Sequence, residues 1–403
     1  MTDTAAKKEY FCRISGLYIH VPFCAGKCPY CDFYSVVPSR NQPSLPDDYT
    51  RALIKELDLQ SAKAFETVYF GGGTPSRLGE ERLAEILRHV SKTNDAEVTV
   101  EINPSDAGRE DRDFNFRLLA ANGVNRISMG LQSAVDSERK ALGRRSGKAE
   151  IERAIKRANE AGIENISLDL MLGIPGQTPS SLDESIDFCV HSGAKHISVY
   201  MLTIEEGTRF YTMRDKLSLP GEDEVCDMYL QAVSRLEKSG FRQYEISNFA
   251  LPGFESRHNL RYWQCKEYTG IGAGAHSFEN GRRFYYPKDI DKYISAFSYD
   301  GKIKKRGIEI ITDPGKEIRV DDGEGGGREE RIMLALRLTE GIGFADYEKR
   351  YGEKLPDDFM RLAKKLADEG LAVLTDTAFS LTARGFLVSN TIIGELTALL
   401  GEK

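Results

Sequence analysis

The sequence has little of what marks a membrane protein or a nucleic-acid-binding protein. It contains no apolar run near the roughly 20 residues of a membrane-spanning helix, although peripheral association with a membrane remains open. Basic residues do not dominate, because 55 Lys and Arg stand against 62 Asp and Glu, a net charge of −7. That balance disfavours broad nucleic-acid binding. Residues 1–10 lack the apolar core of a secretory leader, so we expect a cytoplasmic protein.

Cysteine is also sparse, with seven in 403 residues, but three of them share one loop. Cys24, Cys28 and Cys31 follow the apolar run 17–21 with C-x3-C-x2-C spacing. A cytosolic setting keeps thiols reduced, which disfavours a disulfide. A structural zinc site is usually closed by four ligands, and the candidate fourth ligand, His20, lies in a strand-like segment. Three thiolates suit an iron–sulfur cluster in which one iron keeps an open position.

The first part of the chain alternates short strand-like runs with longer amphipathic stretches. The expected strands cover 17–21, 67–70, 97–102, 126–129, 165–170 and 196–200. The expected helices cover 48–62, 80–90, 113–121, 148–161 and 180–191, where apolar residues recur at helical spacing. Six β–α units in a row predict an α/β protein with a parallel sheet. Periodicity does not decide whether the sheet closes into a barrel.

The C-terminal part of the chain has a different pattern of expected helices and strands. Helices over 331–338, 344–351 and 357–369, strands over 371–374 and 378–381, and a helix over 384–400 predict a winged-helix-like α+β module. Its mixed charge disfavours nucleic acid as a partner. We expect five segments in all. They are a tail (1–14), the parallel α/β domain (15–240), an aromatic and glycine-rich extension packing on that domain (241–320), a flexible glycine-rich loop (321–328) and the C-terminal module (329–403).

Polar and glycine-rich residues follow several of the expected strands. Parallel sheets bind ligands at the carboxyl ends of their strands. The sequence 71–75, Gly-Gly-Gly-Thr-Pro, ends the second strand and lets a ligand approach the backbone closely. Glu101, Gln132 and Asp169 end or lie within the next three, and Arg144 suits a ligand carboxylate. Taken singly, each such residue is more often a helix cap or a solvated residue than a functional one.

The cysteine spacing resembles the signature of the radical S-adenosylmethionine (SAM) enzymes. Together with GGGTPS (71–76), EINP (101–104), SMGLQS (128–133) and LGIPGQT (172–178), it resembles the oxygen-independent coproporphyrinogen III oxidase family. The resemblance covers nearly the whole chain. It implies a partial (β/α)6 barrel, open on one side, with a [4Fe-4S] cluster held by the three cysteines and with SAM bound at the open iron.

The resemblance also implies roles for single residues around SAM. Tyr18 would contact the SAM carboxylate, and Tyr30 would lie against the adenine. The methionyl part and the rest of the SAM pocket, including the ribose, would be held by Gly72, Gly73, Thr74, Glu101, Gln132, Arg144 and Asp169.

Two departures from the oxidase pattern favour a haem-chaperone branch of the family. Cys24 comes early, which leaves little chain ahead of the cluster loop, and Phe33 stands where the oxidase has a further cysteine. The sequences HNLRYW (258–263) and GAGAHS (272–277) fit that branch. It implies a protein that binds haem and delivers it to an acceptor protein, with a homodimer possible. An oxidase, or a radical SAM enzyme with another substrate, is the alternative.

Three residues are candidates for the haem site. His258 would ligate the iron, while Tyr262 and Trp263 would lie against the flat macrocycle. The alternative is that His258 satisfies a buried hydrogen bond and that Trp263, the only tryptophan in the chain, packs in the core.

Overall fold

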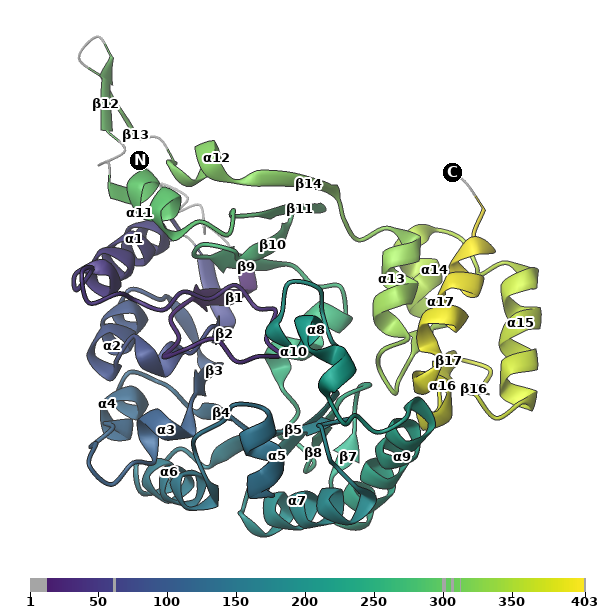
Figure 1. Cartoon of the computed structure of the whole chain (residues 1–403). Helices are drawn as coiled ribbons and strands as arrows, with labels where there is room; N and C mark the ends of the chain where they lie inside the picture. Colours follow the sequence, from purple (N-terminus) through teal and green to yellow (C-terminus); the bar gives the residue numbers. More distant parts are fainter. Residues whose placement is uncertain (1–12, 61–62, 299–301, 306–307, 312, 402–403) are drawn as a thin grey trace, which may run out of the picture.

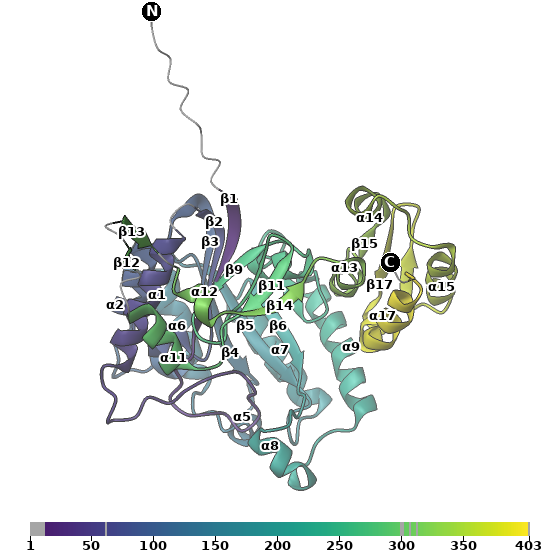
Figure 2. The same ribbon diagram turned by 90° about the horizontal axis from the view of Figure 1, so that it is seen from above.

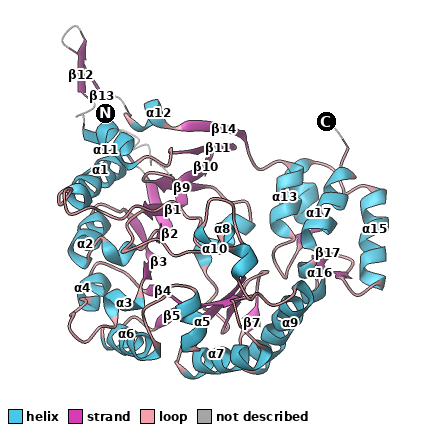
Figure 3. Cartoon of the chain, viewed as in Figure 1, coloured by secondary structure: helices cyan, strands magenta, loops and turns pink. Residues whose placement is uncertain are grey.

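The fold was analysed in a computed structural model, which describes residues 13–60, 63–298, 302–305, 308–311 and 313–401. Most of the predicted tail, 1–14, lies outside these ranges. An arc of strands carries helices on its outer side (Figure 1, Figure 3). None of the helices in the described ranges is long and apolar enough to cross a membrane.

The six predicted parallel strands are confirmed, and all are longer than expected. They pair in sequence order from β1 to β6. Their bounds are β1 (Arg13–Val21), β2 (Lys63–Gly72), β3 (Lys92–Ile102), β4 (Arg126–Gln132), β5 (Asn165–Leu172) and β6 (His196–Met201). Apolar side chains along them are almost fully buried, including Leu17, Ile19 and Val21 of β1, because helices cover the outer face of the arc.

The outer helices bury one apolar face each against the sheet. In α6, for example, Ile151, Ala154, Ile155 and Ala158 are buried at helical spacing. Gly162 and Gly193 follow α6 and α7 with positive φ angles of 86° and 85°, which ends both helices. The helices are α1 (Leu45–Leu59), α2 (Glu80–Arg88), α3 (Pro104–Ala107), α4 (Phe116–Ala121), α5 (Asp136–Ala141), α6 (Lys148–Glu160), α7 (Pro179–His191), α8 (Arg209–Thr212) and α9 (Glu222–Lys238).

The segment 241–320 extends the sheet at both ends of the arc. Beyond β6 lie two antiparallel strands, β8 (Asn248–Ala250) and β7 (Arg242–Gln243). Beyond β1 lie β9 (Tyr268–Ile271), β10 (His276–Glu279), β11 (Arg282–Tyr285) and β14 (Val320–Glu324). The twelve strands therefore form one open sheet with β14 and β7 at its edges. This arrangement agrees with the predicted partial barrel.

The prediction of a flexible loop over 321–328 is wrong in its first half. Val320–Glu324 form the edge strand β14, which pairs with β11. An ion pair of 2.6 Å between Arg282 and Asp321 joins the same two strands. Local composition, rich in glycine and acid, suggested mobility, but pairing with a distant strand determines the structure here.

A short helix, α10 (Arg257–Trp263), packs against β2 and is hydrogen-bonded to β3. Its first turn is held by the Glu97 carboxylate, which accepts hydrogen bonds from the backbone N–H groups of Arg257 (3.0 Å) and His258 (2.9 Å). The remaining elements of the extension are α11 (Ile290–Ser298), the hairpin β12 (Lys302–Lys305) and β13 (Ile308–Ile311), and α12 (Gly315–Ile318).

The C-terminal module stands beyond α9, on the side of the arc away from α1 and α2 (Figure 2). It combines a three-stranded sheet of order β15-β17-β16 with five helices. The predicted final helix is in fact two helices, α16 and α17, which meet at Val388. The elements are α13 (Arg328–Ala335), β15 (Ile342–Gly343), α14 (Phe344–Tyr351), α15 (Asp357–Asp368), β16 (Ala372–Leu374), β17 (Ala378–Leu381), α16 (Ala383–Leu387) and α17 (Ser389–Ala398).

Candidate functional site

The three cysteines lie in a loop that leaves the carboxyl end of β1. The loop is closed at its base by backbone hydrogen bonds from Cys24 N to Val36 O (2.9 Å) and from Val36 N to Pro22 O (2.7 Å). Cys24, Cys28 and Cys31 are half-buried free thiols. Within the described chain no three His, Cys, Asp or Glu side chains stand close enough to hold a single metal ion. A four-iron cluster binds its thiolates on separate irons, so it does not require the three sulfurs to converge on one ion.

The glycine-rich loop after β2 lies directly against the start of the cysteine loop. Gly73 N donates to Val21 O at 2.9 Å, and Thr74 N donates to Phe23 O at 2.8 Å. The Thr74 hydroxyl lies 3.5 Å from the Cys24 sulfur. Gly72 has a φ of 109°, and a Cβ there would come within 2.5 Å of the His20 ring. A side chain at this position would therefore displace the His20 ring, which lines the same cavity as Gly72.

Two carboxyl groups lie at this end of the sheet, on β3 and β5, which are separated by β4. Glu101 is the penultimate residue of β3 and accepts a 2.8 Å hydrogen bond from the Tyr69 hydroxyl. Burial raises the pKa of Glu101 to about 7, and the hydrogen bond from Tyr69 opposes that rise. Burial also raises the pKa of Asp169 on β5, against hydrogen bonds from Ser198 and Ser128. Near pH 7 Glu101 can therefore exchange a proton with a ligand.

Three further SAM candidates gather beside β4. Gln132 has a positive φ of 69°. The side chains of Gln132 and Arg144 both approach Gly130, where a Cβ would meet Arg144 Nη2 at 2.2 Å and Gln132 Nε2 at 2.6 Å. Arg144 donates to Gly130 O at 3.1 Å, but its buried Nε has no hydrogen-bond partner among the described residues. Tyr30 packs beside them against Phe210, so a guanidinium and an aromatic face border the same space.

The haem candidate His258 is 1% exposed and has partners at both ring nitrogens. Nδ1 lies 2.8 Å from the Thr67 hydroxyl, and Nε2 lies 2.7 Å from the Tyr262 hydroxyl. Burial lowers the pKa of His258 to about 3, so the ring is neutral. This geometry favours the alternative reading, a buried histidine that satisfies hydrogen bonds, over an iron ligand. Trp263 is half-buried in the same helix.

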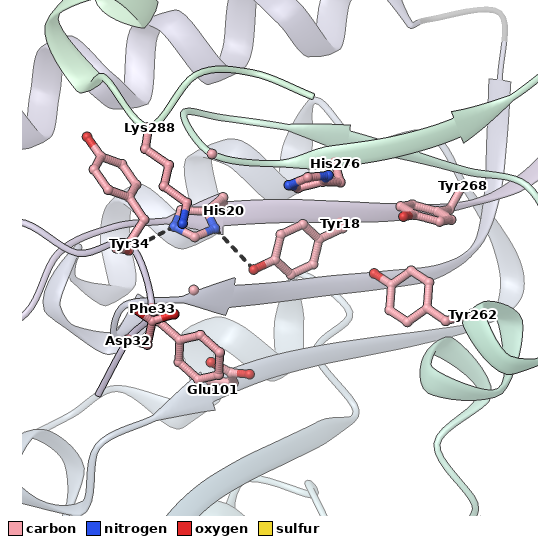
Figure 4. Close-up of a pocket in the computed structure, with 12 residues that line it drawn as sticks. Tyr18, His20, Asp32, Phe33, Tyr34, Glu101, Tyr262, Tyr268, His276 and Lys288 are labelled. Carbon is pink, nitrogen blue, oxygen red and sulfur yellow. Dashed lines mark hydrogen bonds between the residues drawn. The ribbon is translucent and has the colours of Figure 1, made fainter. Parts of the chain in front are cut away.

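An open cavity of about 310 Å³ lies where the cysteine loop, β1, β10 and α10 meet (Figure 4). It includes three of the predicted SAM residues, Tyr18, Gly72 and Glu101, together with Tyr262. The Tyr18 hydroxyl lies 3.2 Å from His20 Nδ1. The other SAM candidates and Trp263 lie outside the cavity lining. The remaining lining residues are His20, Asp32, Phe33, Tyr34, Tyr268, Gly274, His276 and Lys288.

Several residues in or beside the cavity received no functional role in the sequence analysis. His276 lies within the GAGAHS motif, which the sequence identifies without assigning a function to the histidine. Tyr69 and Lys288 gave none, because a tyrosine in a buried strand and a lysine after a tyrosine pair are common features. Only the packing of β2 on β3, and the return of the chain after β11, bring these side chains to the site.

The fold and the site define the radical SAM class. The model of the Radical SAM superfamily matches residues 18–189, and the model of the HemN C-terminal domain matches residues 328–388. The crystallised coproporphyrinogen III oxidase HemN of Escherichia coli has the same fold, with a TM-score of 0.75 and 22% identity over 96% of this chain and 89% of that one.

Curated relatives narrow the class to one family. The chain is 37% identical to the heme chaperone HemW of Bacillus subtilis over 396 residues, which cover 96% of this chain and 99% of that protein. It is 39% identical to the heme chaperone HemW of Escherichia coli over 66% of this chain and 71% of that protein. This protein therefore belongs to the HemW family of heme chaperones.

Proposed function

We propose that this protein is a cytoplasmic haem chaperone that binds a [4Fe-4S] cluster, SAM and haem and passes the haem to an acceptor protein. The observation that carries the proposal is the match to the Bacillus subtilis heme chaperone, which extends over 96% of this chain and 99% of that protein. Both the cysteine loop and the C-terminal module lie within so long a match, so the likeness is not confined to a shared barrel.

The cluster and SAM have residues of fitting chemistry at the ends of the strands. Cys24, Cys28 and Cys31 would hold three irons as thiolates, and the cluster, when bound, supplies an iron with an open position. Arg144, whose buried Nε lacks a protein partner among the described residues, would donate to a SAM carboxylate or hydroxyl. Glu101 would accept from donor groups of SAM while Tyr69 holds its carboxyl in place.

The remaining SAM contacts follow the same plan. Tyr18 lines the cavity and would meet the SAM carboxylate, whereas Tyr30 would lie against the adenine. Gly72, Gly73 and Thr74 would take the methionyl part along their backbone. Gln132 and Asp169 would complete the pocket around the ribose.

The second candidate function is a radical SAM enzyme, either a coproporphyrinogen III oxidase or one with another substrate. The presence of every residue type needed for SAM favours it. Phe33 argues against the oxidase. It directly follows Asp32 in the cysteine loop, lines the cavity and is 71% exposed, so a phenyl ring stands where the oxidase pattern has a thiol.

Cysteine variants test the cluster and SAM parts of the proposal. Cys24→Ser, Cys28→Ser and Cys31→Ser should each lose most of the iron and sulfide retained after anaerobic reconstitution, and should bind SAM more weakly in equilibrium dialysis. Cys226→Ser is the matched control, since Cys226 is a half-buried free thiol on the remote helix α9. Full iron and sulfide content in the three loop variants would refute the cluster assignment.

A homodimer is the proposed assembly, with the cluster supporting it. Sedimentation of the reconstituted and the cluster-free protein at equal concentration tests this proposal. A dimer only with the cluster supports it, and a monomer in both states contradicts it.

A further inference from the structure

We propose that haem binds on the side of the cavity formed by His276, Lys288 and Phe33, next to the SAM contacts proposed for the same cavity, with His276 as an axial ligand of the iron and Lys288 paired with a propionate. The inference rests on the proposed haem-chaperone function and adds the place and the ligands. It assigns the iron to a different histidine from the one that the sequence motif suggested.

The six histidines of the chain differ in whether their ring nitrogens are free. Three are buried and have both nitrogens engaged: His20 with Tyr18 and Tyr34, His196 with Ser167 and Tyr244, and His258 with Thr67 and Tyr262. His89 and His191 use Nδ1 at helix surfaces. His276 alone has neither nitrogen hydrogen-bonded to another residue of the described ranges. An iron ligand needs a free imidazole nitrogen.

The His276 ring is also held in place. It lies on β10, and Tyr285 on the neighbouring strand β11 stacks on it with a centroid separation of 5.1 Å and an interplanar angle of 24°. The residue is exposed towards the cavity rather than packed away. Partial burial lowers the pKa of His276, so the imidazole is neutral near pH 7, which is the form that binds a metal.

Lys288 supplies the charge that haem carboxylates require. Its side chain reaches into the cavity from the segment after β11, near His20 and Tyr34 (Figure 4). Its ammonium group forms no ion pair with a carboxylate of the described chain. Asp32 and Glu101 lie on the opposite rim (Figure 4). This asymmetry orients a dianionic ligand with its propionates towards Lys288.

The walls of the cavity suit a flat, apolar macrocycle. Phe33 projects from the cysteine loop with 71% of its surface exposed, which is unusual for a phenylalanine. Tyr34, Tyr262 and Tyr268 add aromatic surface around the same space. The cavity opens to solvent beside Phe33, so a bound ligand keeps an exposed edge through which an acceptor protein can take it.

Variants of His276 test the iron ligand. Ferric haem titrated into the full-length protein should give a Soret band typical of histidine ligation. His276→Ala should shift that band and weaken haem binding by at least about tenfold, while SAM binding is retained. Added imidazole should restore the wild-type spectrum. His191→Ala, which changes a surface histidine of α7, is the matched control. His258→Ala should keep the wild-type Soret position, which would show that His276 and not His258 ligates the iron.

The outcomes separate this inference from the proposed function. If the wild-type protein binds no haem, the proposed function fails. If it binds haem and His276→Ala binds it with unchanged spectrum and affinity, the proposed function stands and the His276 assignment is overturned.

A matched ligand tests Lys288. Lys288→Met should weaken binding of haem several-fold but leave binding of haem dimethyl ester, which lacks the propionate charges, unchanged. Equal weakening for both ligands would overturn the propionate contact, because a charge pair cannot act on an uncharged ester.

Discussion

The Tyr69 hydroxyl donates a hydrogen bond of 2.8 Å to Oε1 of Glu101, joining the carboxyl ends of the neighbouring strands β2 and β3. The Tyr69 ring also stacks on His258, with a centroid separation of 5.1 Å, and on Tyr18, with 6.3 Å. One tyrosine thus connects a proposed SAM contact with the buried His258 of helix α10. Its hydroxyl lowers the pKa of a carboxyl group that burial has raised to about 7.

Tyr69→Phe should therefore raise the pKa of Glu101 further. Glu101 accepts hydrogen bonds from SAM more strongly while it is ionised, so SAM affinity falls as the pH is lowered through this pKa. In the variant the fall should begin about half a unit to one unit higher in pH. Equilibrium dialysis of SAM between about pH 6 and 9 measures this pH dependence of SAM affinity. Glu101→Gln should remove the dependence, and a Tyr69→Phe profile identical to wild type would contradict the account.

Gly72 offers a second test of the SAM pocket. Gly72→Ala should weaken SAM binding by at least about tenfold, because the new Cβ would lie 2.5 Å from the His20 ring beside the ligand approach. Gly79→Ala is the matched control. Its φ of 94° imposes similar backbone strain, but its Cβ would have no neighbour nearer than 3.6 Å. Equal SAM affinity in both variants would show that the glycine loop does not contact SAM.

Glu56 provides a prediction about stability and pH. This carboxyl group of α1 is 3% exposed and accepts hydrogen bonds from Tyr286 and from Tyr293 of α11. Burial raises its pKa from 4.5 to about 7. The folded state therefore binds a proton more tightly than the unfolded state does. The associated stability is fully present below about pH 4.5 and is lost as the pH rises through about 7.

Glu56→Gln should flatten this dependence, because the amide stays neutral. Between about pH 5 and 8 the wild-type protein should lose on the order of 1–3 kcal/mol more unfolding free energy than the variant. Urea unfolding at both pH values measures the difference. Parallel losses in the two proteins would contradict a raised pKa at Glu56.

The six parallel strands could be predicted because each is a short apolar run between amphipathic helices. Buried parallel strands carry that pattern in their own residues. The strands added at the edges of the sheet could not be predicted in this way, because β7, β8 and β9 have four residues or fewer. For β14 the local composition predicted a loop, because Asp321, Asp322 and Gly323 are poor strand formers. Pairing with β11 nevertheless makes them a strand.

The residues of the site also differ in whether the sequence alone could predict their roles. The spacing of Cys24, Cys28 and Cys31 is a local property, so the proposed cluster loop can be predicted from the sequence alone. His258 was a reasonable candidate for iron because histidine is a frequent ligand, but its burial with Thr67 and Tyr262 depends on how α10 packs. His276 and Lys288 reach the cavity only through the pairing of β10 and β11 with the rest of the sheet.

The most direct test of the account places both candidate functions in one experiment. Cluster-reconstituted protein is incubated anaerobically with SAM, a strong reductant and coproporphyrinogen III, and a parallel sample is titrated with haem. We expect stoichiometric haem binding and no protoporphyrinogen IX. Formation of protoporphyrinogen IX, with no saturable binding of haem, would contradict the chaperone account and assign the protein to the oxidases.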